Sequence, residues 1–126
     1  LGSPQEKTML KNFLNKVSKP HSISELPPGP IPNNLSPEGR ARLQKDLEVL
    51  INTEGLPNGL PIKSRVLTIF GNKDAIVNSS SITLFINELN NYLDEKPSHW
   101  TIPTEGHSLL TPKLISEVAE WLEKSL

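Results

Sequence analysis

Apolar residues recur at helical spacing in two stretches of the first half of the chain. In residues 5–18 and 36–52 they fall three or four positions apart with polar residues between them, which is typical of amphipathic helices. Ser36 can cap the second helix, and Pro37 suits its first position because the missing N–H would have no partner there. The connection between the helices is rich in proline, and we expect a stiff linker. Alternatively, the run Leu26–Pro32 presents a polyproline ligand to a partner.

The second half of the chain alternates between two kinds of pattern. One is the near-continuous apolar run of a strand buried on both faces, and the other is the helical repeat. This order predicts two parallel strands joined by a right-handed helical crossover. The expected elements are a strand at 64–70, a helix at 79–94 with Ile82, Phe85, Leu89 and Leu93 along one face, a short strand at 98–103, and a helix capped by Thr111 with Pro112 at its first position and Leu114, Ile115, Val118, Trp121 and Leu122 on its apolar side.

The composition changes near residue 60, where glycine and proline cluster between the two patterns. We therefore divide the chain into a helical segment with a Pro-rich connection, residues 1–60, and a strand–helix–strand–helix part, residues 61–126. The fold class is α/β. Two parallel strands need covered faces and further strands to pair with, so we expect an incomplete fold, the carboxyl-terminal part of a larger parallel sheet. Leu1-Gly2-Ser3 resembles the scar of a removed tag or the native end of a strand, and both interpretations predict a piece of a longer protein.

Charge and cysteine content exclude several functions. The 126 residues carry a formal net charge of −1 and contain no block of Lys or Arg, so nothing predicts nucleic-acid binding. The chain contains no cysteine, which removes thiolate catalysis and cysteine-based metal sites but leaves the redox compartment open. His21, His99 and His107 lack the spacing of a metal site, and we expect none. No apolar run approaches the length of a membrane span, and without a visible secretory signal we expect a soluble, intracellular protein.

Two short motifs follow the two expected strands. The segment Arg65–Val77 places Asp74 just past the first apolar run, and the segment Thr104–Leu110 places His107 in a glycine-marked loop after the second. Open α/β sheets bind their ligands at the carboxyl ends of the strands, where both residues would lie. A carboxylate and an imidazole placed in this way are typical of a nucleophile–His–Asp triad. The alternatives are a turn-forming role for Asp74 and a surface-loop role for His107.

The stretch from residue 63 to 126 resembles the end of an α/β-hydrolase. Gly71–Val77 is similar to the acid loop of that family, and Gly106-His107-Ser108 followed by Leu109-Leu110 is similar to its histidine loop. The order also fits, because the family's triad runs nucleophile, acid, histidine along the chain. The resemblance implies that Asp74 is the catalytic acid and His107 the base. Residues 5–60 would then match a helical cap, and we expect some of its apolar residues to contact substrate, chosen from Met9, Phe13, Leu43 and Leu47.

The nucleophile of such a triad is missing. No Gly-x-Ser-x-Gly elbow occurs in residues 1–126, and Ser108 adjoins the histidine too closely to reproduce one. We expect the chain alone to be inert, with the nucleophile on missing sequence or on another chain. The resemblance implies part of a serine hydrolase acting on a small ester, thioester or other acyl substrate, as a carboxylesterase or an acyltransferase, without metal or organic cofactor. Haloalkane and epoxide hydrolysis, which use an Asp nucleophile on the same scaffold, stay open.

Besides the hydrolase interpretation, two others stay open. One is a non-catalytic binding or regulatory fragment that uses the hydrolase scaffold, or only its Pro-rich segment and amphipathic helices, to engage a partner. A third interpretation is that the amino-terminal half of the fold is supplied as a separate chain, and that the unpaired strand and open helix faces form the interface. His21 and His99 are expected to be plain surface or loop residues, and Trp100 and Trp121 to be packing residues.

Overall fold

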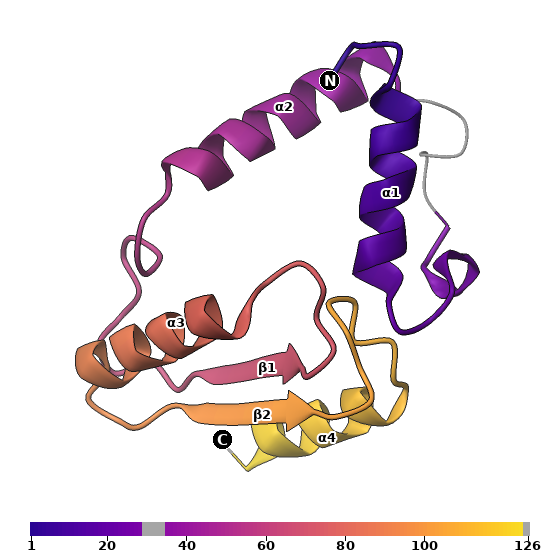
Figure 1. The fold of residues 1–126 in the computed structure, drawn as a ribbon. Coiled ribbons are helices and arrows are strands. Elements are labelled where there is room, and N and C mark those ends of the chain that lie inside the picture. Colours follow the sequence, from indigo (N-terminus) through magenta and orange to yellow (C-terminus); the bar gives the residue numbers. More distant parts are fainter. Residues whose placement is uncertain (29–34, 125–126) are drawn as a thin grey trace.

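A computed structural model of the chain describes residues 1–28 and 35–124. It contains helices and one parallel sheet of two strands, which confirms a small α/β architecture. Figure 1 shows the elements, which run along the chain as α1 (Glu6–Ser18), the 3₁₀ turn η1 (Ile23–Glu25), α2 (Pro37–Asn52), β1 (Leu67–Gly71), α3 (Ser79–Tyr92), β2 (Ser98–Ile102) and α4 (Lys113–Glu123).

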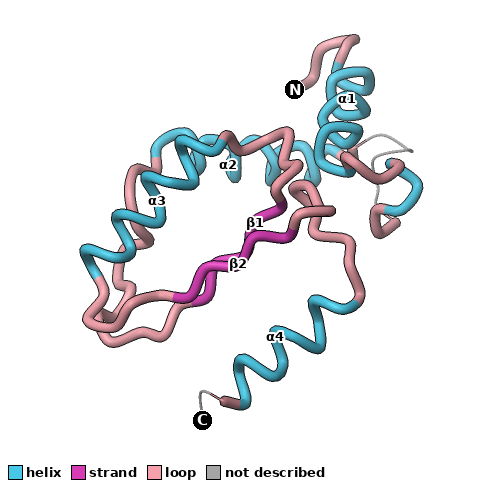
Figure 2. The backbone as a smooth tube through the Cα atoms, turned by 60° about the horizontal axis from the view of Figure 1, so that its bottom comes forward, coloured by secondary structure: helices cyan, strands magenta, loops and turns pink. Residues whose placement is uncertain are grey.

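The two strands lie side by side with both carboxyl ends at the same edge of the sheet. In the parallel register, Leu67 stands opposite Ser98 and Gly71 opposite Ile102. Figures 1 and 2 show α3 and α4 on opposite sides of the strands, the arrangement that parallel strands adopt when both faces are covered. The loops that leave β1 and β2 therefore begin next to each other.

The predicted start of α2 is confirmed. The Ser36 hydroxyl accepts the N–H of Gly39 at 3.0 Å, and the helix begins at Pro37. In α3 the cap is Asn78, whose side chain accepts the N–H of Ser81 at 2.8 Å. Both contacts satisfy an N–H that the helix itself leaves without a partner.

The predicted cap of the last helix is wrong. The helix α4 begins at Lys113, Pro112 occupies the cap position, and no side chain caps the helix. Thr111 is held instead in the preceding turn, where its N–H donates to the Leu109 carbonyl at 2.9 Å. Leu109 adopts a φ of 48°, which leads the chain into this turn before the helix starts.

The predicted apolar face of α3 is buried in part, and Ile82 and Phe85 are only half-buried. Leu89 is 1% exposed and Leu93, which follows the helix, is 7% exposed. The other segments with a predicted apolar stripe also form helices, but the described residues do not cover those apolar faces. Ile115 and Leu122, which we expected on the apolar side of α4, are exposed among the described residues.

The strand β1 is less buried than its sequence predicts. Of its five residues only Thr68 and Gly71 are buried, while Leu67, Ile69 and Phe70 are partly exposed. We expected burial on both faces within a larger sheet, and the described residues by themselves do not provide it. The apolar stripe of α2 is open as well, with Leu50 at 72% exposure. An apolar strand and an apolar helix face are thus both left without full cover by the described residues.

The helices α1 and α2 are joined by a two-pronged ion pair. Arg40 Nε donates to Glu6 Oε1 at 3.0 Å, and its Nη2 donates to Glu6 Oε2 at 2.9 Å. The segment after α1 reaches the loops at the carboxyl ends of the strands (Figure 1). Residues 29–32 of the predicted polyproline run lie outside the described residues. Across residues 1–28 and 35–124, no helix is both long and apolar enough to cross a membrane.

Candidate active site

Asp74 lies in the turn that follows β1, and its two carboxylate oxygens have separate partners. Oδ1 accepts the N–H groups of Ile76 at 2.7 Å and Val77 at 3.0 Å. Oδ2 lies 3.0 Å from Nδ1 of His107. The side chain is 8% exposed. Asp74 therefore forms the turn and contacts the imidazole at the same time, so the two roles considered for it are compatible.

His107 lies in the loop after β2, 33 residues further along the chain than Asp74. An ionised carboxylate can only accept hydrogen bonds, so the imidazole nitrogen that faces Asp74 carries the proton. The other nitrogen, Nε2, then has a free lone pair. No residue in the described ranges forms a hydrogen bond with Nε2, and the side chain is 38% exposed. This is the arrangement in which an imidazole can accept a proton from a reacting group.

The surroundings of Asp74 favour its charged form. Burial raises the pKa of the carboxyl, but the hydrogen bonds from the N–H groups of Val77 and Ile76 and from His107 lower it by more in total. The pKa of Asp74 therefore lies below its ordinary value. The carboxylate is charged near neutral pH, as a group that orients an imidazole must be.

This lowered pKa predicts how the loop responds to acid. A carboxyl whose pKa is lower in the folded state stabilises the fold above its ordinary value of 3.8. That contribution is lost as the pH falls through the folded-state value. We expect the melting temperature of the wild type to exceed that of Asp74→Asn above the ordinary value and the two to converge in acid, as measured by thermal unfolding at several pH values.

The control for this measurement is Glu6→Gln. The hydrogen bond from Arg40 holds the pKa of the Glu6 carboxyl below its ordinary value, so Glu6 has its own acid dependence. When Glu6 is already replaced by Gln, adding Asp74→Asn should still remove the acid dependence of stability that Asp74 contributes. If the melting temperature changes with pH equally in chains with and without Asp74, the prediction is contradicted.

The backbone holds the two loops against each other. Beyond the strands, the N–H of Asn72 donates to the Ile102 carbonyl at 3.0 Å, and the N–H of Lys73 donates to the Glu105 carbonyl at 2.9 Å. Gly71 lies so close to the histidine loop that an added Cβ would stand 2.1 Å from the carbonyl oxygen of Gly106. These contacts bring Asp74 and His107, which are distant in sequence, to hydrogen-bonding distance.

The structure gives His21 and His99 defined partners. His21 lies in the loop after α1, as expected, whereas His99 lies on β2, so the expectation of a plain surface or loop residue is wrong for His99. His21 Nε2 lies 2.7 Å from Oε2 of Glu105. His99 lies on β2 and its Nδ1 is 2.5 Å from the Thr68 hydroxyl. Glu105 itself was missed by sequence reasoning, although an acidic residue directly before Gly106-His107 was a usable signal.

Ser108 lacks the geometry of a nucleophile elbow. Its hydroxyl is buried and has no hydrogen-bond partner among the described residues. The positive φ of this loop falls on Leu109, one residue later, whereas an elbow strains the backbone at the nucleophile. The helix α4 also begins several residues further on. These features agree with the expectation that Ser108 does not replace the missing nucleophile.

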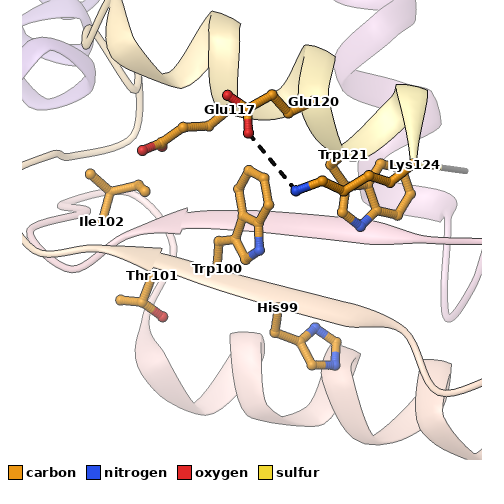
Figure 3. Close-up of a pocket in the computed structure, with 8 residues that line it drawn as sticks. All are labelled: His99, Trp100, Thr101, Ile102, Glu117, Glu120, Trp121 and Lys124. Carbon is orange, nitrogen blue, oxygen red and sulfur yellow. Dashed lines mark ion pairs between the residues drawn. The ribbon is translucent and has the colours of Figure 1, made fainter.

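A shallow groove lies between β2 and α4 (Figure 3), and neither Asp74 nor His107 lines it. Trp100 faces α4, whereas His99 projects from the opposite face of the strand, as alternation along a strand requires. Ion pairs join Lys113 to Glu117 at 3.1 Å and Lys124 to Glu120 at 3.9 Å, so the acidic side chains at the groove have basic partners. The groove is lined by His99, Trp100, Thr101, Ile102, Glu117, Glu120, Trp121 and Lys124.

Trp121 has a packing role that its sequence position predicts. Its ring lies under the guanidinium of Arg65, 4.9 Å from the ring centroid, and its Nε1 donates to the Ser98 hydroxyl at 3.4 Å. These contacts join α4 to the start of the sheet. Within the described ranges, no group of three or more His, Cys, Asp or Glu side chains is arranged to hold a metal ion.

Comparisons with known proteins add no assignment. A scan against protein-family models, a search of curated proteins and a search of solved structures each return no match. The chemical interpretation therefore depends on the geometry of Asp74, His107 and the loops that carry them.

Proposed function

We propose that Asp74 and His107 are the acid and the base of a nucleophile–His–Asp triad, and that the chain is the carboxyl-terminal part of a serine hydrolase of the α/β-hydrolase fold. The observation that carries the proposal is the 3.0 Å contact between His107 Nδ1 and Asp74 Oδ2 at the carboxyl ends of two adjacent parallel strands. The substrate class is a small ester, a thioester or a related acyl compound.

In this mechanism His107 Nε2 takes the proton of the attacking hydroxyl as the acyl–enzyme bond forms. It then donates that proton to the leaving group, and it repeats the cycle with water in the second half of the reaction. Asp74 keeps the other proton on Nδ1 and stabilises the charged imidazolium. Its lowered pKa supports this role because the carboxyl stays ionised throughout.

The hydroxyl would come from sequence outside residues 1–126 or from a second chain. Two features support an amino-terminal half that pairs with β1. Parallel strands are normally found in larger sheets, and β1 has one described neighbour, β2. Apolar side chains of the strand and of the helices also lack full cover, including Leu84 of α3 at 65% exposure.

The test is to isolate the native assembly that contains this chain and to identify every polypeptide in it. We expect a segment with the pattern strand–Gly-x-Ser-x-Gly–helix, on the same parent chain or on an associated one. A fluorophosphonate, which reacts with activated serine hydroxyls, should label that serine and abolish ester turnover. The isolated 126-residue chain is the control, and it should be neither labelled nor active.

The opposite outcome is equally informative. If the native assembly carries a residue without a hydroxyl, thiol or carboxylate at the elbow position, the hydrolase proposal fails. The scaffold would then serve as a non-catalytic binding or regulatory fragment.

A further inference from the structure

Glu105 is a buried carboxylate that stands directly before Gly106-His107. The residue is 4% exposed. Its Oε2 lies 2.7 Å from His21 Nε2, and its Oε1 accepts the hydroxyl of Thr104 at 3.3 Å. A buried carboxylate is costly unless it has such partners, and 2.7 Å is typical of a strong, charge-assisted hydrogen bond. Glu105 therefore depends on His21 for its main side-chain partner.

His21 belongs to a distant part of the chain. It follows α1, where its N–H donates to the Ser18 carbonyl at 2.9 Å, and it is 84 residues away from Glu105 in sequence. Its second nitrogen, Nδ1, lies 3.6 Å from the exposed carboxylate of Glu25. The closer contact is thus the one with Glu105, and it joins the amino-terminal segment to the histidine loop.

The backbone contact beside this pair is very close. A Cβ added to Gly106 would stand 1.7 Å from the carbonyl oxygen of Lys19, so only glycine allows the segment after α1 to lie against the loop here. Gly106 is the residue directly before His107. A shift of the segment Lys19–His21 would therefore displace Gly106 and, with it, the imidazole of His107.

Glu105 also touches the loop that carries the acid. Its carbonyl accepts the N–H of Lys73 at 2.9 Å, and Lys73 directly precedes Asp74. The backbone of Glu105 therefore faces the acid loop, while its side chain is held by His21. One residue fixes the histidine loop from two sides.

We propose that the His21–Glu105 pair is a latch by which the segment after α1 sets the position of the histidine loop, so that His21 and Glu105 are positioning residues for His107. The inference rests on the proposed function in so far as His107 is the catalytic base. In the framework of that function, the amino-terminal segment that resembles a cap would align the base as well as cover the sheet.

The test reads the imidazole of His107 directly in the full 126-residue chain. Nitrogen NMR distinguishes which ring nitrogen carries the proton, and the three histidines are assigned by replacing each in turn. At one alkaline pH, we expect wild-type His107 to show a single tautomer with its proton on Nδ1. In His21→Ala, its nitrogen shifts should move more than half of the way to those of a histidine in the unfolded chain.

Two further variants make the result specific. His21→Gln supplies an N–H that can reach Glu105, and it should restore most of the wild-type signature. Glu25→Gln removes the weaker, exposed neighbour of His21 and should change nothing. If His21→Ala unfolds the chain, the double variant His21→Ala/Glu105→Gln replaces it, because it breaks the latch without leaving a buried charge.

The proposal is overturned if His107 keeps its wild-type signature in the latch-breaking variants while the melting temperature falls. A purely structural ion pair would give that result. Because this measurement needs no nucleophile, it is independent of turnover. If His107 responds to the latch-breaking variants but the native assembly hydrolyses no ester, the proposed function is contradicted and the latch is not. If the assembly is active but His107 does not respond, the latch is contradicted and the proposed function is not.

Discussion

If the chain is part of the proposed hydrolase, Asp74→Asn should lower kcat of the native assembly by about 10⁴-fold while the fold is retained. The amide oxygen has to take the place of Oδ1, because an amide NH₂ there would face the two N–H donors of Ile76 and Val77. The amide NH₂ then replaces Oδ2 and donates to His107 Nδ1. The imidazole has to carry its own proton on Nε2, where it can no longer accept the proton of the nucleophile.

The measurement is steady-state ester hydrolysis by the native assembly, with Asp94→Asn as the matched control. Asp94 is an exposed aspartate outside the site, so the same chemical change there should leave kcat as it is. His107→Ala should also abolish turnover. A loss below about tenfold in Asp74→Asn, far from the factor expected of a triad acid, would assign Asp74 to turn formation alone.

Gly71→Ala lowers the free energy of unfolding by about 2–3 kcal/mol, which corresponds to a fall of about 10 °C in melting temperature. The new Cβ would stand 2.1 Å from the carbonyl oxygen of Gly106 and 2.5 Å from that of Glu105. Both obstacles are backbone atoms, so no side-chain rotation can relieve the contact. The acid loop and the histidine loop must move apart, and the Asp74–His107 contact should be lost with them.

Thermal unfolding of Gly71→Ala is best compared with that of Gly59→Ala. Gly59 has a φ of 80° with nothing near its missing Cβ, so alanine there meets backbone strain and no clash. We expect it to cost about 1 kcal/mol. If both variants are destabilised equally, close packing of the two loops is not what Gly71 provides.

Much of the architecture could be predicted because its causes are local. The apolar periodicity of α3 and the Ser36 cap of α2 follow from neighbours within a few residues, and the parallel pairing of the two strands follows from the helical crossover between them. The meeting of Asp74 with His107 could be anticipated for a related reason. Parallel strands place their carboxyl ends together whatever the intervening sequence is.

The errors concern contacts that no local pattern encodes. His21 and Glu105 are 84 residues apart, so neither residue type at its own position indicates the other. Thr111 was mistaken for a cap because its preference was read without the turn at Leu109 that already holds it.

The anchoring of Asp74 by two backbone N–H groups has a consequence for how an active assembly would form. The carboxylate is fixed by its own turn, and the imidazole is fixed by the carboxylate, all within one polypeptide. Aligning the acid and the base costs conformational entropy, and that cost therefore arises when this chain folds. When a segment that carries the nucleophile associates with this chain, only that segment still has to lose conformational freedom. Association then has a smaller entropy cost, and the affinity is higher.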